Sequence, residues 1–167
     1  MEDEDALLRL LNSTPVVGGE QQDLLTDGDT ATALARDLGG HGSAAEVAEL
    51  SRVREVLQTA VRTGEVPAGL ENVLAGVVRR PQLGPDGVRW ELDVPAERVP
   101  AVRAVLAWSH LQEARPGRLR ACGNDECRRF LVDRTRAGTA RWCSMAVCGN
   151  RMKARRHHSR QRDAAAG

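Results

Sequence analysis

The sequence is 167 residues long, 41% apolar and close to neutral, with a formal net charge of +1. This length fits one ordinary domain, or one domain with a small appendage. It shows neither a secretory signal nor a long apolar run, which argues against a membrane protein and predicts a cytoplasmic location. This small net charge is the sum of two oppositely charged parts. Residues 1–114 hold 10 basic and 19 acidic side chains (net −9), and residues 115–167 hold 14 basic and 4 acidic side chains (net +10).

Residues 1–114 predict a mostly helical domain. An apolar turn at 7–11 follows an acidic start, 2–5, that we expect to fray, and residues 16–19 are expected to be extended or looped. A helix is predicted over 29–38 and ends at Gly39-Gly40. Ser43 caps a longer helix whose apolar residues recur at three- and four-residue steps until Gly64.

A short helix at 68–74 and a small β-hairpin come next. Residues 77–78 and 88–94 are the expected strands, and the Pro- and Gly-containing segment 79–87 is the expected connection. Val88, Trp90 and Leu92 alternate with charged residues, which predicts one buried face. Aromatic residues are scarce, so Trp90 and Trp108 are the expected bulky fillers of an aliphatic core. A last helix opens at Pro95 or Pro100, and Pro116-Gly117 marks the expected domain boundary.

All four cysteines lie in the basic part, as two pairs of equal spacing, Cys122-x4-Cys127 and Cys143-x4-Cys148. Four thiolates can surround one zinc ion and leave no position for water, so such a site is structural. The alternatives are two disulfides or four unlinked thiols. We favour one structural Zn²⁺ per chain, because disulfides are rare in the cytoplasm and the surrounding sequence is too polar to form a core.

The expected finger is a treble-clef-like arrangement of knuckle, hairpin and helix, with a ribbon lacking the helix as the alternative. Residues 130–132 are predicted to pair with 139–142 across a turn at 136–138, and Ser144 to cap a helix that carries Cys148. The predicted fold class is therefore α+β, with a mostly helical sensor or dimerisation domain at 1–114, a zinc finger with a basic helix at 115–163, and a disordered tail at 164–167.

Past Met152 the predicted helix has no apolar residue larger than Ala154 until Asp163, so it cannot pack in a core. Its cations are candidate DNA contacts, because each cation near a phosphate releases counterions; a solvated, frayed tail is the alternative. Asn150 and Trp142 flank the second cysteine pair, and we interpret both as structural side chains around the metal site, although Asn can also pair with adenine and Trp can stack on a base. The candidate DNA-binding residues are Arg151, Lys153, Arg155, Arg156, Arg160 and Arg162.

The segment RLRACGNDECRRFLVDRTRAGTARWCSMAVCGNRMKARRHHSR closely resembles the CGNR zinc finger of bacterial transcription regulators, over about residues 117–160. In that family the finger usually follows an ABATE domain, described as a stress-induced regulator module. Here Asn12-Ser13-Thr14, Gly18-Gly19 and Asp23-Leu24-Leu25 resemble the opening of that domain. The chain departs from the family at Leu10-Leu11, where an aromatic residue is common, and at Ala137, where Asn is common.

The resemblance implies a zinc-dependent, DNA-binding regulator, stress-related and nucleoid-associated in a bacterial cytoplasm, with double-stranded DNA as its partner. A homodimer and a small-molecule effector remain open. The alternative function is a protein-interaction module whose basic helix docks on an acidic protein surface. We do not expect an enzyme: His41 and His110 are isolated, and Gly18-Gly19 lacks the rest of a phosphate-loop signature.

Overall fold

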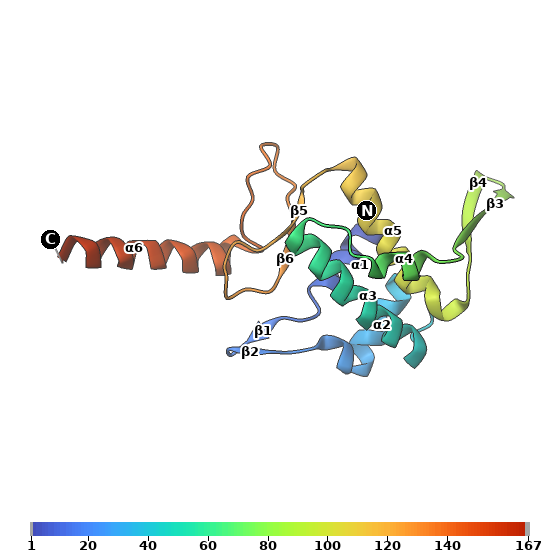
Figure 1. Cartoon of the computed structure of the whole chain (residues 1–167), viewed down its shortest axis with the longest axis horizontal. Coiled ribbons are helices and arrows are strands. Elements are labelled where there is room, and N and C mark those ends of the chain that lie inside the picture. The colour runs from blue at the N-terminus through green and yellow to red at the C-terminus, as the bar shows by residue number, and fades with distance from the viewer. Residues whose placement is uncertain (1, 166–167) are drawn as a thin grey trace.

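Residues 2–165 are described by the computed structural model, apart from the side chains of Glu2 and of 163–165. The chain forms a helical body from which helix α6 projects as a single rod (Figure 1). Of the predicted tail, 166–167 lie outside the described residues, and 164–165 are the last residues of α6. Within the described residues, none of the helices is both long and apolar enough to cross a membrane.

The body is built from helices packed around aliphatic side chains. They are α1 (Glu2–Leu11), α2 (Gly28–Asp37), α3 (Ala44–Thr63), α4 (Gly69–Leu74) and α5 (Val99–Ala114). Leu7, Leu10, Leu50 and Leu57 are among the fully buried residues, with Phe130 as the largest of them. Each buried Leu contributes roughly 1.5–3 kcal/mol by leaving water. The mixed α+β class is confirmed.

Helix α3 begins and ends where its local sequence predicts. The Ser43 hydroxyl accepts the Glu46 backbone N–H, and Glu46 accepts the N–H of Ser43 at 2.8 Å and of Gly42 at 2.6 Å, a complete capping box. Burial opposes the charge of Glu46, yet these backbone donors and that of His41 hold the pKa of its carboxyl below the usual value. Gly64 ends the helix at φ +76°, which favours glycine.

The smaller elements follow the same chain order. β1 (Val16–Val17) and β2 (Glu20–Gln21) form a tight hairpin turned by Gly18-Gly19, at φ +62° and +92°. The short helices η1 (Leu24–Thr26) and η2 (Ala96–Arg98) precede α2 and α5. The acidic start, which we expected to fray, is helical instead: α1 begins at Glu2, and Glu4 pairs with Arg115.

The hairpin of β3 (Val78–Gly84) and β4 (Gly87–Asp93) differs from its prediction. Most of the expected connection is strand, because Arg79 pairs with Leu92 and Leu83 with Val88, leaving a two-residue turn. The predicted buried face is also wrong: Val88 is 59% exposed and Trp90 is 57% exposed, and Leu92 is only half-buried. The hairpin projects from the body (Figure 1), and an open cavity lies between its apolar face and α5, so that face is not packed into the core. Trp90 is therefore not a core residue, whereas Trp108 packs against the core.

The strand pairing in the finger also differs. β6 (Phe130–Val132) pairs with β5 (Leu119–Ala121), not with residues 139–142, which form no strand. The reason is tertiary: Leu119 and Phe130 join the core of the body, so the hairpin that buries them is favoured. A π-helical turn, η3 (Met145–Gly149), then leads into α6 (Asn150–Ala165), which confirms a helix after the second cysteine pair.

A buried polar network joins the end of α1 to α3. Arg54, 2% exposed, makes two bonds to Asp23, at 2.6 and 2.7 Å, and a third to Ser13 at 3.0 Å. Gln58 donates to the carbonyl of Leu11 and to the Thr14 hydroxyl. The Arg54 bonds hold the pKa of the Asp23 carboxyl below its usual value. Residues 13–14 and 23 are thus structural.

Asn12 docks the finger onto this network. Its carbonyl accepts the Phe130 N–H at 2.7 Å, and its amide donates to the Phe130 carbonyl at 3.2 Å, so one side chain acts as an extra strand partner. The Arg62 guanidinium lies 4.6 Å from the centroid of the same ring. Arg134 of the finger pairs with Glu4 and Asp5 of α1. The position of the finger is therefore set by the body.

Asn12→Ala removes both bonds and leaves the N–H and carbonyl of the buried residue Phe130 without their partner. We expect a loss of about 1–3 kcal/mol in the free energy of unfolding, with zinc binding retained, measured by urea unfolding of the zinc-loaded chain. Asn72→Ala, at an exposed position of α4, is the matched control and should cost little. Equal stability of the two variants would contradict the docking role.

Candidate metal centre and basic helix

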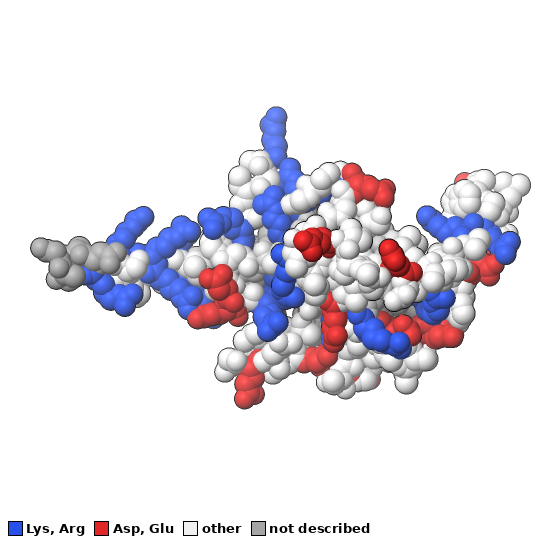
Figure 2. All heavy atoms as spheres, viewed as in Figure 1, with Lys and Arg blue, Asp and Glu red and all other residues white. Residues whose placement is uncertain are grey.

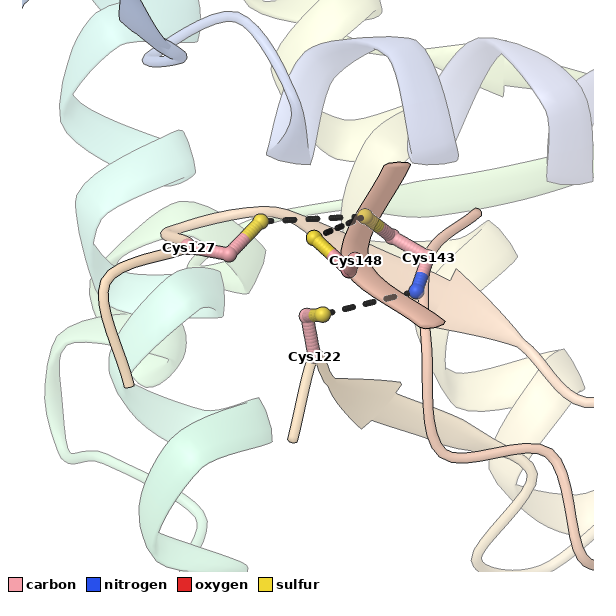
Figure 3. A group of neighbouring side chains, drawn as sticks. All are labelled: Cys122, Cys127, Cys143 and Cys148. Carbon is pink, nitrogen blue, oxygen red and sulfur yellow. Dashed lines mark hydrogen bonds between the residues drawn. The ribbon is translucent and has the colours of Figure 1, made fainter. Parts of the chain in front are cut away.

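The four cysteine side chains converge on one point between the finger hairpin and the start of η3 (Figure 3). All four sulfur atoms lie within 4.8 Å of one another. Sγ of Cys143 lies 3.7 Å from Sγ of Cys127 and 3.7 Å from Sγ of Cys148. The sequence prediction that both pairs face the same centre is confirmed.

These separations distinguish the alternatives that the spacing left open. A disulfide needs an S–S distance of about 2.05 Å, and all four thiols are free. In a tetrahedral site with Zn–S bonds of about 2.3 Å, neighbouring sulfurs are separated by roughly 3.8 Å. The observed 3.7 Å separations fit that tetrahedron. The donor set is therefore that of a single structural zinc site.

Backbone hydrogen bonds place each sulfur. The Cys122 N–H donates to the Arg129 carbonyl at 2.8 Å, where the chain leaves β5, and the Cys127 N–H donates to the Asn124 carbonyl in the turn between the first pair. The Cys143 N–H points at Sγ of Cys122, 3.4 Å away. Cys148 is carried by η3, which Ser144 caps as predicted by accepting the Val147 N–H.

Electrostatics favours a cation at the centre of this cluster. Burial, together with the neighbouring sulfurs, raises the pKa of the Cys143 thiol far above its usual value, and burial also raises the pKa of Cys127. Four thiolates therefore repel one another strongly unless a positive ion lies between them. Zn²⁺ supplies that charge and binds thiolates in preference to water.

Asn124 is a metal-site residue that the sequence analysis missed. Its side chain is completely buried, and its amide lies 3.6 Å from Sγ of Cys148 as a donor. Although burial acts in the opposite direction, hydrogen bonds led by that of Asn124 hold the pKa of the Cys148 thiol below its usual value. A signal existed: Cys-Gly-Asn occurs twice, at 122–124 and 148–150.

Asn150, in the second copy of that tripeptide, lies differently. It is exposed, and its amide donates to the Ala146 carbonyl at 3.2 Å, which closes the turn carrying Cys148 rather than contacting a sulfur. Equivalent sequence positions thus have different surroundings, because Asn124 precedes a tight turn inside the finger and Asn150 opens a solvated helix.

Trp142 packs over the two glycines of the same tripeptides. A Cβ on Gly123 would lie 3.2 Å from the indole, and one on Gly149 would lie 3.4 Å from the indole and 2.8 Å from Met145. A larger residue at Gly123 would therefore press on the ring and on the Arg141 carbonyl, and one at Gly149 would displace the flexible end of Met145. The ring is half-buried, with Arg141 on it at 5.4 Å from the centroid. In this structure the indole thus contacts the backbone of both tripeptides.

Asp133 organises the loop between the hairpin and the second cysteine pair. It is buried and accepts the Thr135 hydroxyl at 2.6 Å, the Thr135 N–H at 2.9 Å and the Ala140 N–H at 3.0 Å. The hydrogen bond from the Thr135 hydroxyl lowers the pKa of the Asp133 carboxyl. Burial acts in the opposite direction, and the two backbone donors add to the lowering. Arg118 and Arg120 lie 3.7 Å from that carboxyl.

The candidate DNA-binding residues all lie on α6, and all are exposed. The helix leaves the body (Figure 1), and Figure 2 shows Lys and Arg gathered along it while Asp and Glu are scattered over the body. Its one acidic neighbour in the described side chains is Glu126, which pairs with Arg155 and lies 3.9 Å from Arg151. The basic rod is therefore presented to solvent close to the metal centre.

Comparison with protein families identifies residues 118–161 as a CGNR zinc finger, which includes the four cysteines, the hairpin and most of α6. Fingers of this kind are associated with transcription regulators. An ABATE domain is not detected by its family model in this chain. A comparison with curated proteins returns no match to the chain.

Cys148→Ser should abolish stable zinc binding, since three thiolates and a hydroxyl no longer match the preferred donor set. Native mass spectrometry is expected to show one zinc per wild-type chain and none in the variant. Because zinc contributes roughly 10–16 kcal/mol of apparent folding free energy to such segments, the finger should lose its ordered NMR signals. A variant that kept both zinc and finger structure would contradict this ligand assignment.

The two asparagines provide a matched pair. Asn124→Ala removes the amide that lies against Sγ of Cys148 and should weaken zinc binding by about 10–100-fold, the usual effect of losing a partner of a metal ligand. Asn150→Ala breaks only a bond within the turn and should have a smaller effect. Competition with a chromogenic chelator measures both, and an equal loss in the two variants would show that Asn124 has no special role.

Proposed function

We propose that this chain is a zinc-dependent, DNA-binding transcription regulator of a bacterial cytoplasm, nucleoid-associated and without catalytic activity. The observation that carries the proposal is α6: a helix of 16 residues with six exposed cations, held at its start by the metal centre and standing free of the body. Four thiolates around one zinc leave no open position for hydrolytic chemistry.

Duplex DNA suits this rod in charge and in size. A helix with its side chains is about 10–12 Å across, and the major groove is about 12 Å wide. Five of the six cations of α6, all but Arg162, have a like-charged neighbour three or four residues away, which destabilises an isolated helix. Phosphates neutralise those charges, which relieves the repulsion within α6. The same contacts release counterions from the DNA, which favours binding.

Glu126 affects this interaction in a specific way. Its carboxylate occupies the guanidinium of Arg155 and lies near Arg151, on the part of α6 nearest the body. A phosphate must displace it there. Arg156, Arg160 and Arg162 have no carboxylate within 4 Å among the described side chains and are open to phosphates.

The helical body at 1–114 takes the role of sensor or dimerisation domain in this proposal, which extends to a stress-related signal. A cavity of about 700 Å³ between the β3–β4 hairpin, α5 and the start of α1 is a candidate effector site, lined by Trp90, Arg103 and His110. A homodimer is expected because one finger with one helix supplies little specificity.

The alternative, a protein-interaction module, is favoured by one observation. The ion pair of Arg155 with Glu126 shows that a guanidinium of α6 binds a carboxylate. An acidic protein surface could take the same position. The two functions differ in salt response, because a shaped protein interface with apolar contacts depends less on counterion release than DNA binding does.

Fluorescence anisotropy of labelled duplex DNA with the zinc-loaded full chain tests the proposal. The logarithm of the association constant should fall linearly with the logarithm of the salt concentration, and Arg156→Ala with Arg160→Ala should reduce the slope by roughly 2, near 0.9 per phosphate contact. Glu126→Gln should strengthen binding by freeing Arg155. Arg36→Ala, exposed on α2 of the body, should change nothing. Absence of binding by the zinc-loaded chain would overturn the proposal.

A further inference from the structure

The residues of α6 sort into four rows around its axis. At about 100° per residue, Asn150, Ala154, His157 and Gln161 fall on one line, all exposed. The half-buried residues of the helix, Met152 and Ser159, fall on the opposite side. The first row therefore faces away from the finger.

The cations occupy the two remaining sides. One flank carries Arg151, Arg155 and Arg162, and the other carries Lys153, Arg156 and Arg160, each about 60–140° away from the outward row. No Lys or Arg lies on the outward row itself. A requirement for positive charge alone would not keep cations off one side of the helix along three turns.

We infer that the outward row is a base-reading face, and that Ala154, His157 and Gln161 determine which DNA sequence this chain prefers. The inference rests on the proposed function. When the row points at the floor of the major groove, the two flanks point at its two walls, where the phosphates are. Contacts with phosphates position a protein, and contacts with base edges specify the sequence.

The three side chains have chemistry that distinguishes bases. The Gln161 amide can accept from N6 and donate to N7 of adenine, as Gln does in the major groove. The His157 imidazole can donate to the O6 or N7 acceptors of guanine. Ala154 offers a methyl group to the methyl of thymine. From 154 to 161 the helix rises about 10 Å, which corresponds to roughly three base pairs at 3.4 Å each.

Asn150 begins this row but is not included among the reading residues. Its amide is engaged by the Ala146 carbonyl, and that bond closes the turn that carries Cys148. Bidentate pairing with adenine needs the same amide group. The metal centre thus sets where the row starts, and reading begins one turn further along, at Ala154.

Selection of tight binders from a duplex library with a randomised central segment, using the zinc-loaded full chain, tests the inference. The affinity ratio between a selected duplex and a scrambled one is then measured for the wild type, Gln161→Ala and His157→Ala. We expect each variant to reduce the ratio by about 5–150-fold while the salt slope stays unchanged. Alanine is a good helix former, and zinc content and circular dichroism check each fold.

Arg160→Ala is the matched control on the flank. It should weaken both duplexes equally and lower the salt slope by about 1. Sequence preference that survives in both Gln161→Ala and His157→Ala would overturn the inference, as would DNA binding without any preference, and the proposed function would stand in either case. If the zinc-loaded chain binds no duplex at all, both the inference and the proposed function fall.

Discussion

The convergence of four thiolates on one point is the constraint on which the finger depends. Residues 118–161 contain little apolar material, and two of its largest buried side chains, Leu119 and Phe130, join the core of the body instead of forming one within the finger. The loops that carry Cys127 and Cys143 have no core of their own to hold them. A cation that balances four buried thiolates supplies the missing free energy. Helix α6 continues directly from η3, the π-helical turn that carries the fourth sulfur, so the metal centre holds the start of α6.

The finger and the body are nevertheless one mechanical unit. Asn12 pairs with the backbone of Phe130, Arg62 covers its ring, and Arg134 binds Glu4 and Asp5. The same segment of the chain that holds Asn12 also holds Ser13 and Thr14, which bond to α3. These hydrogen bonds connect α3 and the end of α1 to β6, the strand that follows the first cysteine pair. This gives the proposed sensor a physical connection to the proposed DNA reader.

Opposite charge in the two parts has a simple consequence for this arrangement. The body carries the negative charge and α6 the positive charge, and the helix still projects away from the body (Figure 2). Only Glu126, itself part of the finger, makes ion pairs with α6 among the described side chains. The cations are thus left solvated, where long-range attraction to a polyanion is strongest at low salt.

The sequence by itself determined the metal ligands, the extents of α2 and α3, and the basic character of α6. These features depend on local chemistry: equal cysteine spacing, a capping box, a C-terminal glycine, and the absence of large apolar residues past Met152. The tertiary structure alone decided the partner of β6, the exposure of Trp90 and the role of Asn124. Strand pairing and burial depend on which surfaces the body offers, and alternation along a strand does not reveal whether a second layer exists. Asn124 and Asn150 end two identical Cys-Gly-Asn tripeptides. Only their surroundings in the fold place the amide of Asn124 against the sulfur of Cys148 and that of Asn150 in a solvated turn.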